Sequence, residues 1–474
     1  MSNRLQPNLV SVTTISADGS RNFLHPADVS GPFTRWRRVA ALVLLGVYVL
    51  LPWIPVNGFP AVFLDVAERH FHFFGLTLAT QDLWLGFFLV SGLAFGLFYV
   101  TSLFGRVWCG WTCPYTVFLE HLYRRVERWI EGDAAARRKL DDAPWSLAKV
   151  MKRGTKHAVF ILLSAAIAHV FLSYFVSIKQ LYVWMQGPPS QHLFSFGVVL
   201  FLTLALYFAF SWFREQFCII LCPYGRLQSA LTDDNTITIG YDKTRGEPRG
   251  KVGTQGAGDC INCQRCVQVC PTGIDIRNGL QLECIGCAAC VDACDAIMTK
   301  VGRPKGLVRY GSLNQLNGGK TRLLRPRTVA YTVLAMLGLV AFGLSLSTVK
   351  SVRVLAKRMP GAPFFTGEGV VRNQFTFHVI NKSHKPASFR LELTSAPAAM
   401  KLMGAESAVE VPPLTEVDRP IIVTIAERDY TGKVPITFTL RELRERGASI
   451  TQRMEFLGPD PRFFQAKTQQ QMTP

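Results

Sequence analysis

Twelve cysteines carry most of the chemistry that this 474-residue sequence could perform. Eight of them form two runs of the same spacing, C-x2-C-x2-C-x3-C, within the thirty-five residues from Cys260 to Cys294. This spacing places three thiolates around one [4Fe–4S] cluster and sends the fourth to the neighbouring cluster. We therefore expect one cluster on Cys260, Cys263, Cys266 and Cys294, and a second cluster on Cys284, Cys287, Cys290 and Cys270.

Zinc and disulfide bonds are the alternative uses of so many cysteines. Zinc sites use two C-x2-C pairs per ion and rarely show a third evenly spaced cysteine or an ending such as Cys270-Pro271. Disulfides require an oxidising compartment, whereas the topology inferred below places this segment in the cytoplasm. The spacing therefore favours two iron–sulfur clusters.

The other four cysteines form an internal repeat. The motif Cys109-x3-Cys113-Pro114-Tyr115 recurs 109 residues later as Cys218-x3-Cys222-Pro223-Tyr224. Two local structures fit the motif: residues i and i+4 share a face of one helix, or the proline begins a new helix. Each copy follows the second apolar span of a pair, so we expect both thiol pairs at one edge of the bilayer, related by a pseudo-twofold axis.

Four thiols at one membrane edge allow several functions. They could bind one metal ion, form a redox-active pair on each side, or receive copper. Apolar packing is the alternative, since free cysteine is commonly buried, but repetition of the whole motif argues against it. We interpret Cys109, Cys113, Cys218 and Cys222 as a redox or metal site and as the candidate catalytic residues.

Five apolar stretches must position these cysteines. They are residues 39–56, 83–104, 157–176, 194–213 and 328–346, each near the roughly 20 residues that cross a bilayer. A net charge of +19 on a chain that is 49% hydrophobic fits membrane spans joined by basic loops. Nucleic-acid binding would also suit a basic chain, but no recognition motif supports it.

The distribution of Lys and Arg predicts the orientation. Residues 105–156 contain eleven of them and residues 214–327 contain sixteen, whereas 57–82 and 177–193 contain one each. The positive-inside rule then places the N-terminus and the cysteine-rich segment in the cytoplasm and the end of the chain in the periplasm. No cysteine follows Cys294, which agrees with this orientation. We expect a multi-pass protein of a bacterial inner membrane.

The pattern changes after the last span to alternating apolar residues, as in 375–379, 389–393, 421–425 and 436–440. Short strands at this spacing predict an immunoglobulin-like β-sandwich, which would serve as an adaptor surface or as a stabilising cap. The predicted fold is thus an α-helical bundle of five transmembrane helices, a cytoplasmic bacterial-type 2[4Fe–4S] ferredoxin domain and a C-terminal β-sandwich. The predicted boundaries are a cytoplasmic tail at 1–34, a four-helix membrane region at 35–225, the ferredoxin domain at 226–327, the fifth helix at 328–346 and the periplasmic domain at 347–474.

This order of parts resembles one family, the cytochrome c oxidase accessory proteins called CcoG, FixG or RdxA. The resemblance runs from about residue 35 to the end and rests on the two C-x3-C-P motifs, the segments 270–275 and 283–290, the last span and the β-sandwich. It implies cluster ligation by the eight loop cysteines and a redox or copper role for the other four. It also implies reduction of Cu(II) to Cu(I) during assembly of a cbb-type oxidase, with oxidase subunits, copper chaperones or copper transporters as partners.

Metal chemistry agrees with that implication. Cu(II) prefers nitrogen and oxygen ligands and Cu(I) prefers thiolates, while iron–sulfur clusters exchange single electrons. We therefore expect an oxidoreductase with two [4Fe–4S] clusters and copper as a transient ion. Two alternatives stay open: a quinol dehydrogenase that passes electrons from the membrane pool to a partner reductase, and a non-catalytic iron–sulfur scaffold for assembly.

Overall fold

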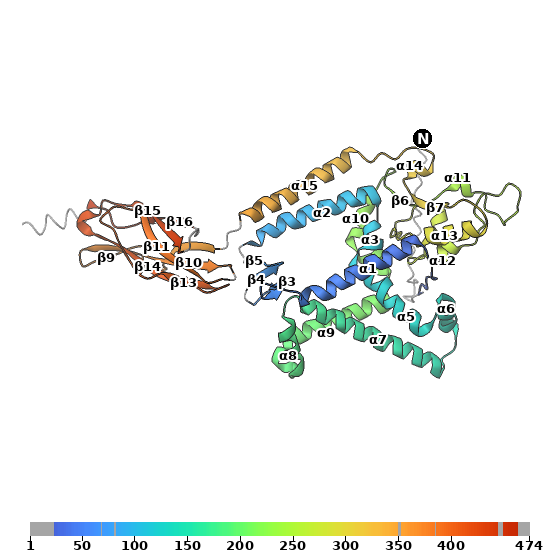
Figure 1. Cartoon of the computed structure of the whole chain (residues 1–474), viewed down its shortest axis with the longest axis horizontal. Helices are drawn as coiled ribbons and strands as arrows, with labels where there is room; N and C mark the ends of the chain where they lie inside the picture. The colour runs from blue at the N-terminus through green and yellow to red at the C-terminus, as the bar shows by residue number, and fades with distance from the viewer. Residues whose placement is uncertain are drawn as a thin grey trace, which may run out of the picture. The chain divides into compact units, whose positions relative to one another are not determined.

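The structure is a computed structural model that describes residues 23–67, 69–79, 82–348, 352–383, 385–443 and 449–462. Its internal contacts divide the chain into two units. The first unit takes in the chain up to Phe74 together with Trp84–Leu344, and the second takes in Gly75–Leu83 together with the chain from Ser345 onward. Helices dominate the first unit and strands dominate the second (Figure 1).

Five helices are long and apolar enough to cross a membrane. They are Pro32–Trp53, which contains α1 (Pro32–Leu50), then α2 (Trp84–Phe104), α7 (Leu147–Leu172), Pro189–Phe213, which contains α9 (Leu193–Phe208), and α15 (Pro326–Ser347). Only 6% to 33% of each apolar window is buried within the chain, so most of these apolar side chains face outward. Apolar surface of that extent marks a membrane-facing protein. The five expected spans are confirmed.

Two of these helices begin earlier than the apolar pattern predicts. α1 begins at Pro32, because proline suits the first turn of a helix. α7 begins at Leu147, well before residue 157, because Ser146 caps it by accepting a hydrogen bond from the Lys149 backbone at 3.3 Å. Capping rather than apolarity sets this helix end, so a hydropathy pattern does not reveal it.

Close packing joins the spans within the first unit. A β-carbon on Gly338 of α15 would lie 2.7 Å from the α-carbon of Gly92 on α2, so the two helices approach through small residues, side by side in Figure 1. α7 packs against α9 and against the segment that follows the first C-x3-C-P motif. There Tyr123, Phe160 and Phe210 form a buried aromatic cluster with ring centroids 4.4 to 5.0 Å apart.

Short elements connect the spans. Before α2 lie η1 (Leu51–Trp53) and the strands β1 (Pro55–Val56), β2 (Phe59–Pro60), β3 (Val62–Asp65), β4 (His70–Phe73) and β5 (Leu76–Ala79). Between α2 and α7 lie α3 (Val107–Trp111), α4 (Pro114–Phe118), the π-turn η3 (Leu119–Tyr123), α5 (Arg124–Glu131) and α6 (Ala134–Asp142). α8 (Ile178–Gln186) and η4 (Pro189–His192) precede α9, and the π-turns η5 (Ala209–Phe213) and η6 (Phe217–Leu221) and helix α10 (Pro223–Leu231) follow it.

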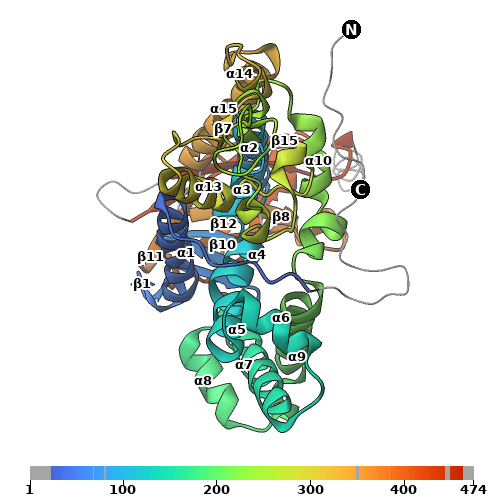
Figure 2. The ribbon, with the colours of Figure 1, turned by 90° about the vertical axis from the view of Figure 1, so that its right-hand side faces the viewer.

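The cysteine-rich segment is closed by a pair of antiparallel strands. β6 (Thr238–Tyr241) pairs with β7 (Val308–Gly311), so the two ends of the segment meet. Between and after these strands lie α11 (Lys243–Gly246), α12 (Arg265–Gln268), η7 (Ile276–Asn278), α13 (Ala289–Lys300) and α14 (Leu313–Leu316). α13 lies close to the start of α1 (Figure 2). Buried apolar side chains such as Ile239, Ile276 and Met298 form the core of this segment.

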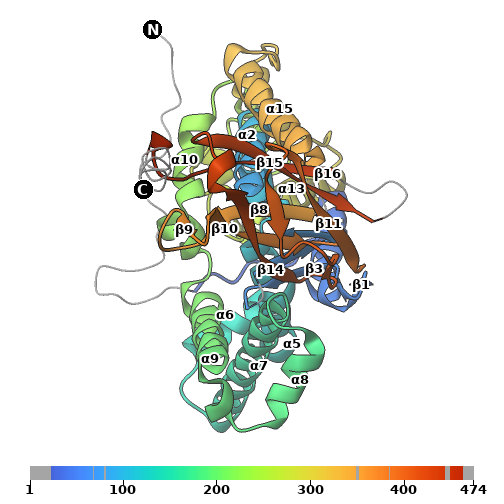
Figure 3. The same ribbon diagram turned by 90° about the vertical axis from the view of Figure 1, so that its left-hand side faces the viewer.

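The second unit contains the expected β-sandwich (Figure 3). One sheet has the order β12-β14-β10-β8 with β9 also paired to β10, and the other has the order β13-β11-β15-β16. The strands are β8 (Val352–Arg358), β9 (Phe365–Gly367), β10 (Val370–Asn381), β11 (Ala387–Ser395), β12 (Lys401–Met403), β13 (Val409–Val411), β14 (Glu416–Ala426), β15 (Val434–Glu442) and β16 (Ser449–Phe456), with η8 (Glu427–Asp429) before β15. Alternate residues face inward, and Phe377 meets Phe438 between the sheets at 4.9 Å.

Candidate functional site

Two loops of matching backbone shape carry the paired cysteine runs. The residues on either side of the central cysteines Cys263 and Cys287 have positive φ: Asn262 and Gln264 at 55°, Gly286 at 67° and Ala288 at 59°. Positive φ is uncommon for residues other than glycine. Its recurrence at equivalent places shows that both runs fold in the same way. Each loop then enters a helix, α12 in the first run and α13 in the second.

All four thiols expected to hold the second cluster line one cavity. Its walls contain Cys270, Cys284, Cys287 and Cys290, together with Cys266 of the neighbouring site. The remaining wall is mainly apolar and includes Ile274, Ile276 and Ile285. The fold therefore brings the last cysteine of the first run to the first three cysteines of the second run, as the crossed ligand assignment requires.

The surroundings of Cys294 agree with the complementary set expected for the first cluster. Burial raises the pKa of the Cys294 thiol to about 12, and the charge of Cys266 and then that of Cys260 add to the shift. Burial also raises the pKa of Cys266, to about 11, and the charges of Cys263 and Cys260 add to that shift. The last cysteine of the second run therefore lies near Cys266 and Cys260 of the first run.

These buried thiols fit iron–sulfur clusters. Burial raises the pKa of Cys284 to about 12, and burial raises that of Cys290 well above its ordinary value. A free thiol in such surroundings stays protonated, whereas a coordinating metal deprotonates it outright. Among the described residues, no three His, Cys, Asp or Glu side chains converge as ligands of a single ion would. A cubane distributes its ligands over four irons, so its thiols stand farther apart than those of a single-ion site.

The four cysteines of the internal repeat also lie near one another, although within the described chain they are not arranged as the ligands of a single ion. We call Cys109, Cys113, Cys218 and Cys222 the thiol quartet. Burial raises the pKa of Cys218 to about 12, and the charges of the other three cysteines of the quartet contribute to that shift. Cys109 is buried within α3 and Cys218 lies in η6. Cys113 and Cys222 are the residues that precede α4 and α10, and a proline begins each of these helices. Of the two local structures predicted for the motif, the structure has the second.

Hydrogen bonds of the motif tyrosines cross between the two repeats. The hydroxyl of Tyr115 in the first motif donates to the Ala209 carbonyl, at the end of the fourth span, at 3.0 Å. The hydroxyl of Tyr224 in the second motif lies 2.5 Å from the Thr101 hydroxyl, near the end of the second span. Each tyrosine thus holds its motif against the other repeat.

The thiol quartet is in contact with the loop of the second cysteine run. A β-carbon on Gly110, next to Cys109, would lie 2.5 Å from the Ile285 carbonyl oxygen and 2.9 Å from the α-carbon of Cys287. Cys109 also belongs to the buried cluster that contains Cys287 and Cys290. Because α3 touches this loop directly at Gly110, Cys109 adjoins the second cysteine run.

Arg106 is a functional candidate that the sequence reasoning missed. Its guanidinium donates to the Leu282 carbonyl. Burial raises the pKa of the thiols of Cys109, Cys218 and Cys284, and the positive charge of Arg106 lowers it. It is buried, so its field is poorly screened by water. In the sequence it resembles any basic residue that follows an apolar span. The only hint was its position three residues before a motif cysteine.

A buried ion-pair network holds the second motif against α5 and α7. Glu127 of α5 accepts from Arg214 at 2.7 Å and pairs with Arg137 at 3.1 Å and with Lys156 at 3.5 Å. Although burial opposes its charge, these cations hold the pKa of Glu127 well below its usual range. Arg124 pairs with Glu215, next in sequence to Arg214, at 2.8 Å. The turn that leads into Cys218 is therefore fixed from two sides.

Comparisons with known proteins agree with this division of the chain. Residues 213–313 match the family described as a 4Fe-4S dicluster domain, residues 84–132 match a 4Fe-4S binding domain, and residues 342–459 match the IG-like fold at the C-terminal of FixG. The match over 84–132 was not predicted, because that stretch contains only Cys109 and Cys113.

Similar proteins extend the match over most of the chain. The nitrogen fixation protein FixG of Rhizobium meliloti is 36% identical over 81% of this chain and 82% of its own length. The chain belongs to the FixG/RdxA family. RdxA of Cereibacter sphaeroides is 36% identical over 90% of this chain and 93% of its own length, and RdxB of the same organism is 37% identical over 87% and 91%.

Family membership confirms the resemblance drawn from the sequence. Together with the two 4Fe-4S matches, it identifies this FixG/RdxA protein as an iron–sulfur electron-transfer protein with a membrane-spanning helical part and an immunoglobulin-like domain. The ligand assigned to each cluster and the role of the thiol quartet stay predictions.

Proposed function

We propose that this FixG/RdxA-family protein reduces Cu(II) to Cu(I) at the thiol quartet, and that the Cu(I) is used in the assembly of a cbb-type cytochrome c oxidase. In this proposal one [4Fe–4S] cluster is held by Cys260, Cys263, Cys266 and Cys294, and the other by Cys284, Cys287, Cys290 and Cys270. The cysteine-rich segment, proposed as residues 226–327, lies on the cytoplasmic side. The immunoglobulin-like domain lies in the periplasm, where it meets oxidase subunits or copper-carrying proteins.

The contact between Gly110 and Cys287 carries the proposal. A β-carbon built on Gly110, next to Cys109, would lie 2.9 Å from the α-carbon of Cys287. The quartet therefore adjoins the loop of the second cysteine run. Electron transfer between two sites requires that they lie close together, and a packed contact provides this closeness. A quartet that served only for apolar packing would not need to adjoin the redox loop.

The chemistry of the quartet suits copper as substrate. When bound, the clusters supply single electrons, and Cu(II) becomes Cu(I) by taking up one of them. Thiolates favour the soft Cu(I) product over the Cu(II) substrate, so binding to the quartet favours the reduction. Burial raises the pKa of the Cys109 thiol, and the charge of Arg106 lowers it. Arg106 therefore helps the thiol to lose its proton when it binds the metal.

Anaerobic copper reduction by purified variants tests the proposal. Cys109→Ser and Cys218→Ser should abolish Cu(I) formation, measured with a Cu(I)-specific chelator, while the iron content stays at the wild-type level. Ser449→Ala, at an exposed position of β16 on the β-sandwich, is the control outside the site and should reduce Cu(II) normally. Normal reduction by both cysteine variants would remove the quartet from the mechanism.

One cavity favours a second candidate, quinol oxidation. A cavity of about 250 Å³ between α7, α8 and α9 is lined mostly by apolar side chains and by His169 and His192. Apolar walls with a few polar groups suit a quinol headgroup. Reduction of the clusters by a soluble quinol, lost in His169→Leu and His192→Leu and accompanied by no Cu(I) formation, would favour this interpretation. Normal oxidase assembly by a folded variant without clusters would instead favour a scaffold.

A further inference from the structure

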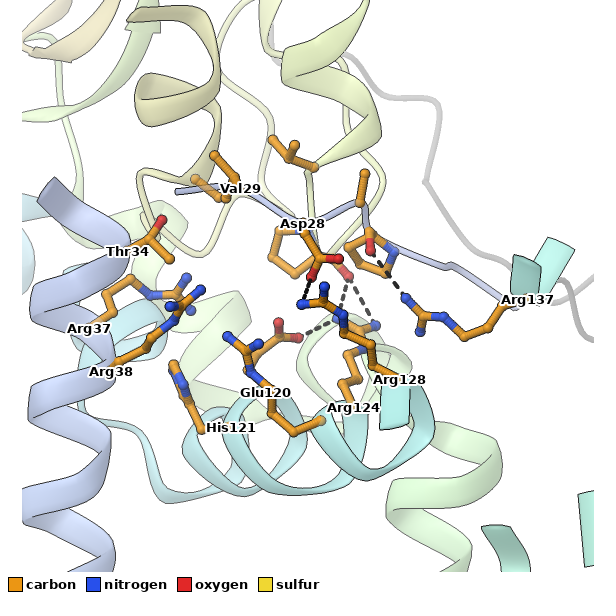
Figure 4. A pocket seen from close by; sticks show the side chains of 16 residues that line it. Asp28, Val29, Thr34, Arg37, Arg38, Glu120, His121, Arg124, Arg128 and Arg137 are labelled. Carbon is orange, nitrogen blue, oxygen red and sulfur yellow. Dashed lines mark hydrogen bonds and ion pairs between the residues drawn. The ribbon is translucent and has the colours of Figure 1, made fainter. Parts of the chain in front are cut away.

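An arginine-rich cavity lies beside the cysteine-rich segment and has no part in the proposed copper chemistry. It is bounded by the N-terminal segment around Asp28, the start of α1, the helical turns η3 and α5, and Pro271 and Ala289 of the two cysteine runs (Figure 4). All of these parts belong to the first unit. Six arginines line it: Arg37, Arg38, Arg124, Arg125, Arg128 and Arg137.

Carboxylates neutralise only some of these arginines. Arg128 pairs with Asp28 at 2.6 Å, Arg137 pairs with Glu127 at 3.1 Å, and Arg124 pairs with Glu215 at 2.8 Å and also with Glu120. Among the described residues, no carboxylate pairs with Arg37, Arg38 or Arg125. The cavity therefore carries a surplus of positive charge.

Arg37 and Arg38 line this cavity, and each has a buried donor that lacks a hydrogen-bond partner in the described part of the chain. Arg37 is only 6% exposed, and its Nε donates to the Gly110 carbonyl at 2.9 Å, but its Nη2 has no hydrogen-bond partner in the described part of the chain. The buried Nε of Arg38 also lacks a partner there. Figure 4 shows both guanidinium groups extending from α1 toward the cavity. A buried charged donor without a partner is costly, so a missing acceptor is the simplest explanation.

Two titrating groups report the same positive field. Burial, followed by the charge of Arg37, lowers the pKa of His121 to about 4, so this imidazole adds no further charge at neutral pH. Burial, followed by the charge of Arg38, lowers the pKa of Arg125. An anion in the cavity would offset the charges of Arg37 and Arg38 and so raise both pKa values.

We propose that this cavity binds a phosphate group, supplied either by the headgroup of an anionic lipid or by free phosphate. Arginine guanidinium groups bind phosphate oxygens through paired, charge-assisted hydrogen bonds. The cavity has about 90 Å³ of space, whereas one water needs roughly 10–15 Å³ by this measure, so a phosphate group fits. Arg37 and Arg38 lie in the first turns of a membrane span, the level at which lipid headgroups meet basic side chains.

The position of Arg37 links this cavity to the redox site. The same side chain lines the cavity and donates to Gly110, which packs against Cys287. A phosphate bound to Arg37 would offset its positive charge beside the second cysteine run. Phosphate binding would therefore change the electrostatic potential where the two groups of cysteines meet.

Two binding measurements on the full-length protein test the proposal and distinguish the two sources. In the first, inorganic phosphate is titrated into protein in nanodiscs of phosphatidylcholine and followed by calorimetry. In the second, native mass spectrometry counts phosphatidylglycerol retained from nanodiscs of mixed phosphatidylglycerol and phosphatidylcholine. Binding in the first alone identifies free phosphate, and selective retention in the second identifies a lipid headgroup.

Variants connect the binding to this cavity. Arg38→Gln and Arg125→Gln remove cations that have no carboxylate partner among the described residues, and each should weaken binding or retention by roughly tenfold. Arg322→Gln, at an exposed position outside the cavity, is the matched control and should bind like the wild type. Unchanged iron content and melting temperature show that a variant is folded. Wild-type binding by both cavity variants, or no binding of either probe by the wild-type protein, would overturn the proposal.

Discussion

Gly110 packs directly against the backbone of Cys287, because a β-carbon on residue 110 would lie 2.9 Å from both the nitrogen and the α-carbon of Cys287. Real β-carbons do not approach backbone atoms so closely. Only glycine therefore allows α3 to meet the loop of the second cysteine run. Through this contact the thiol quartet and the proposed second cluster adjoin.

The contact predicts that Gly110→Ala separates the two sites. The added methyl group must displace the loop, and overpacking of this kind costs about 1–3 kcal/mol of stability. We expect a lower melting temperature and Cu(II) reduction slowed by roughly tenfold or more, with the chelator assay as the measurement. Gly154→Ala is the matched control, since a β-carbon there meets nothing within 4 Å and alanine favours a helix. Equal stability and activity of the two variants would show that the contact is unimportant.

Crossed ligation predicts the iron content of double variants. If Cys270 and Cys287 hold the same cluster, the variant with serine at both positions loses one cluster and keeps about four of about eight irons. Serine at both Cys294 and Cys287 should remove both clusters and leave almost no iron. Iron and acid-labile sulfide analysis of anaerobic protein measures this. Uncrossed ligation would reverse the first result, because each run would then hold its own cluster and Cys270→Ser with Cys287→Ser would remove both.

The position of Arg106 predicts slower thiol chemistry in Arg106→Gln. Burial raises the pKa of Cys109 to about 12, and Arg106 is the principal charge that opposes this shift. Without Arg106 the pKa of the Cys109 thiol should rise further, and each unit of that rise lowers the thiolate fraction tenfold. Alkylation of copper-free protein, followed by mass spectrometry across alkaline pH, should be several-fold slower. Arg106→Lys keeps the charge, so its thiol should be alkylated at about the wild-type rate. Equal alkylation rates in Arg106→Gln and Arg106→Lys would contradict an electrostatic role of Arg106.

The network around Glu127 predicts both a stability loss and a pH dependence. Glu127→Gln leaves Arg214, Arg137 and Lys156 without their shared carboxylate, which should cost about 3–5 kcal/mol. Because the folded-state pKa of Glu127 is lowered, its contribution is present above the unfolded-state value of about 4.3 and is lost as the pH falls toward the folded-state pKa.

Thermal unfolding in detergent between about pH 3 and pH 7 measures this effect. The wild-type protein should lose stability on acidification more steeply than Glu127→Gln. Glu410→Gln, at an exposed position of β13, is the control and should follow the wild-type curve. Parallel curves for wild type and Glu127→Gln would show that this carboxylate is not the titrating group.

Local patterns in the sequence were sufficient to predict the spans, the β-sandwich and the cysteine runs. Apolar length, alternation and the C-x2-C-x2-C-x3-C spacing each report a structure formed by residues close in sequence. The strands expected around Phe375, Phe389, Ile421 and Ile436 lie within β10, β11, β14 and β15. Crossing of the fourth cysteines is implied by the motif itself and stays a prediction.

Contacts between distant segments could not be predicted in this way. Gly110 resembles any loop glycine until the loop at Cys287 is placed against it. Arg37 and Arg106 both resemble basic residues at the end of a span, although one lines the arginine-rich cavity and the other adjoins thiols. The crossed hydrogen bonds of Tyr115 and Tyr224 depend on how the two repeats pack, which the repeat alone does not specify.

The proposal that Cu(II) takes its electron from this protein is tested most directly by a single-turnover titration. Protein reduced without oxygen and freed of reductant is mixed with Cu(II), and EPR follows the reduced-cluster and Cu(II) signals while a chelator counts Cu(I). We predict that both signals disappear together and that about two Cu(I) form per chain, one electron from each cluster. Persistence of both signals, with no Cu(I) formed, would contradict the account.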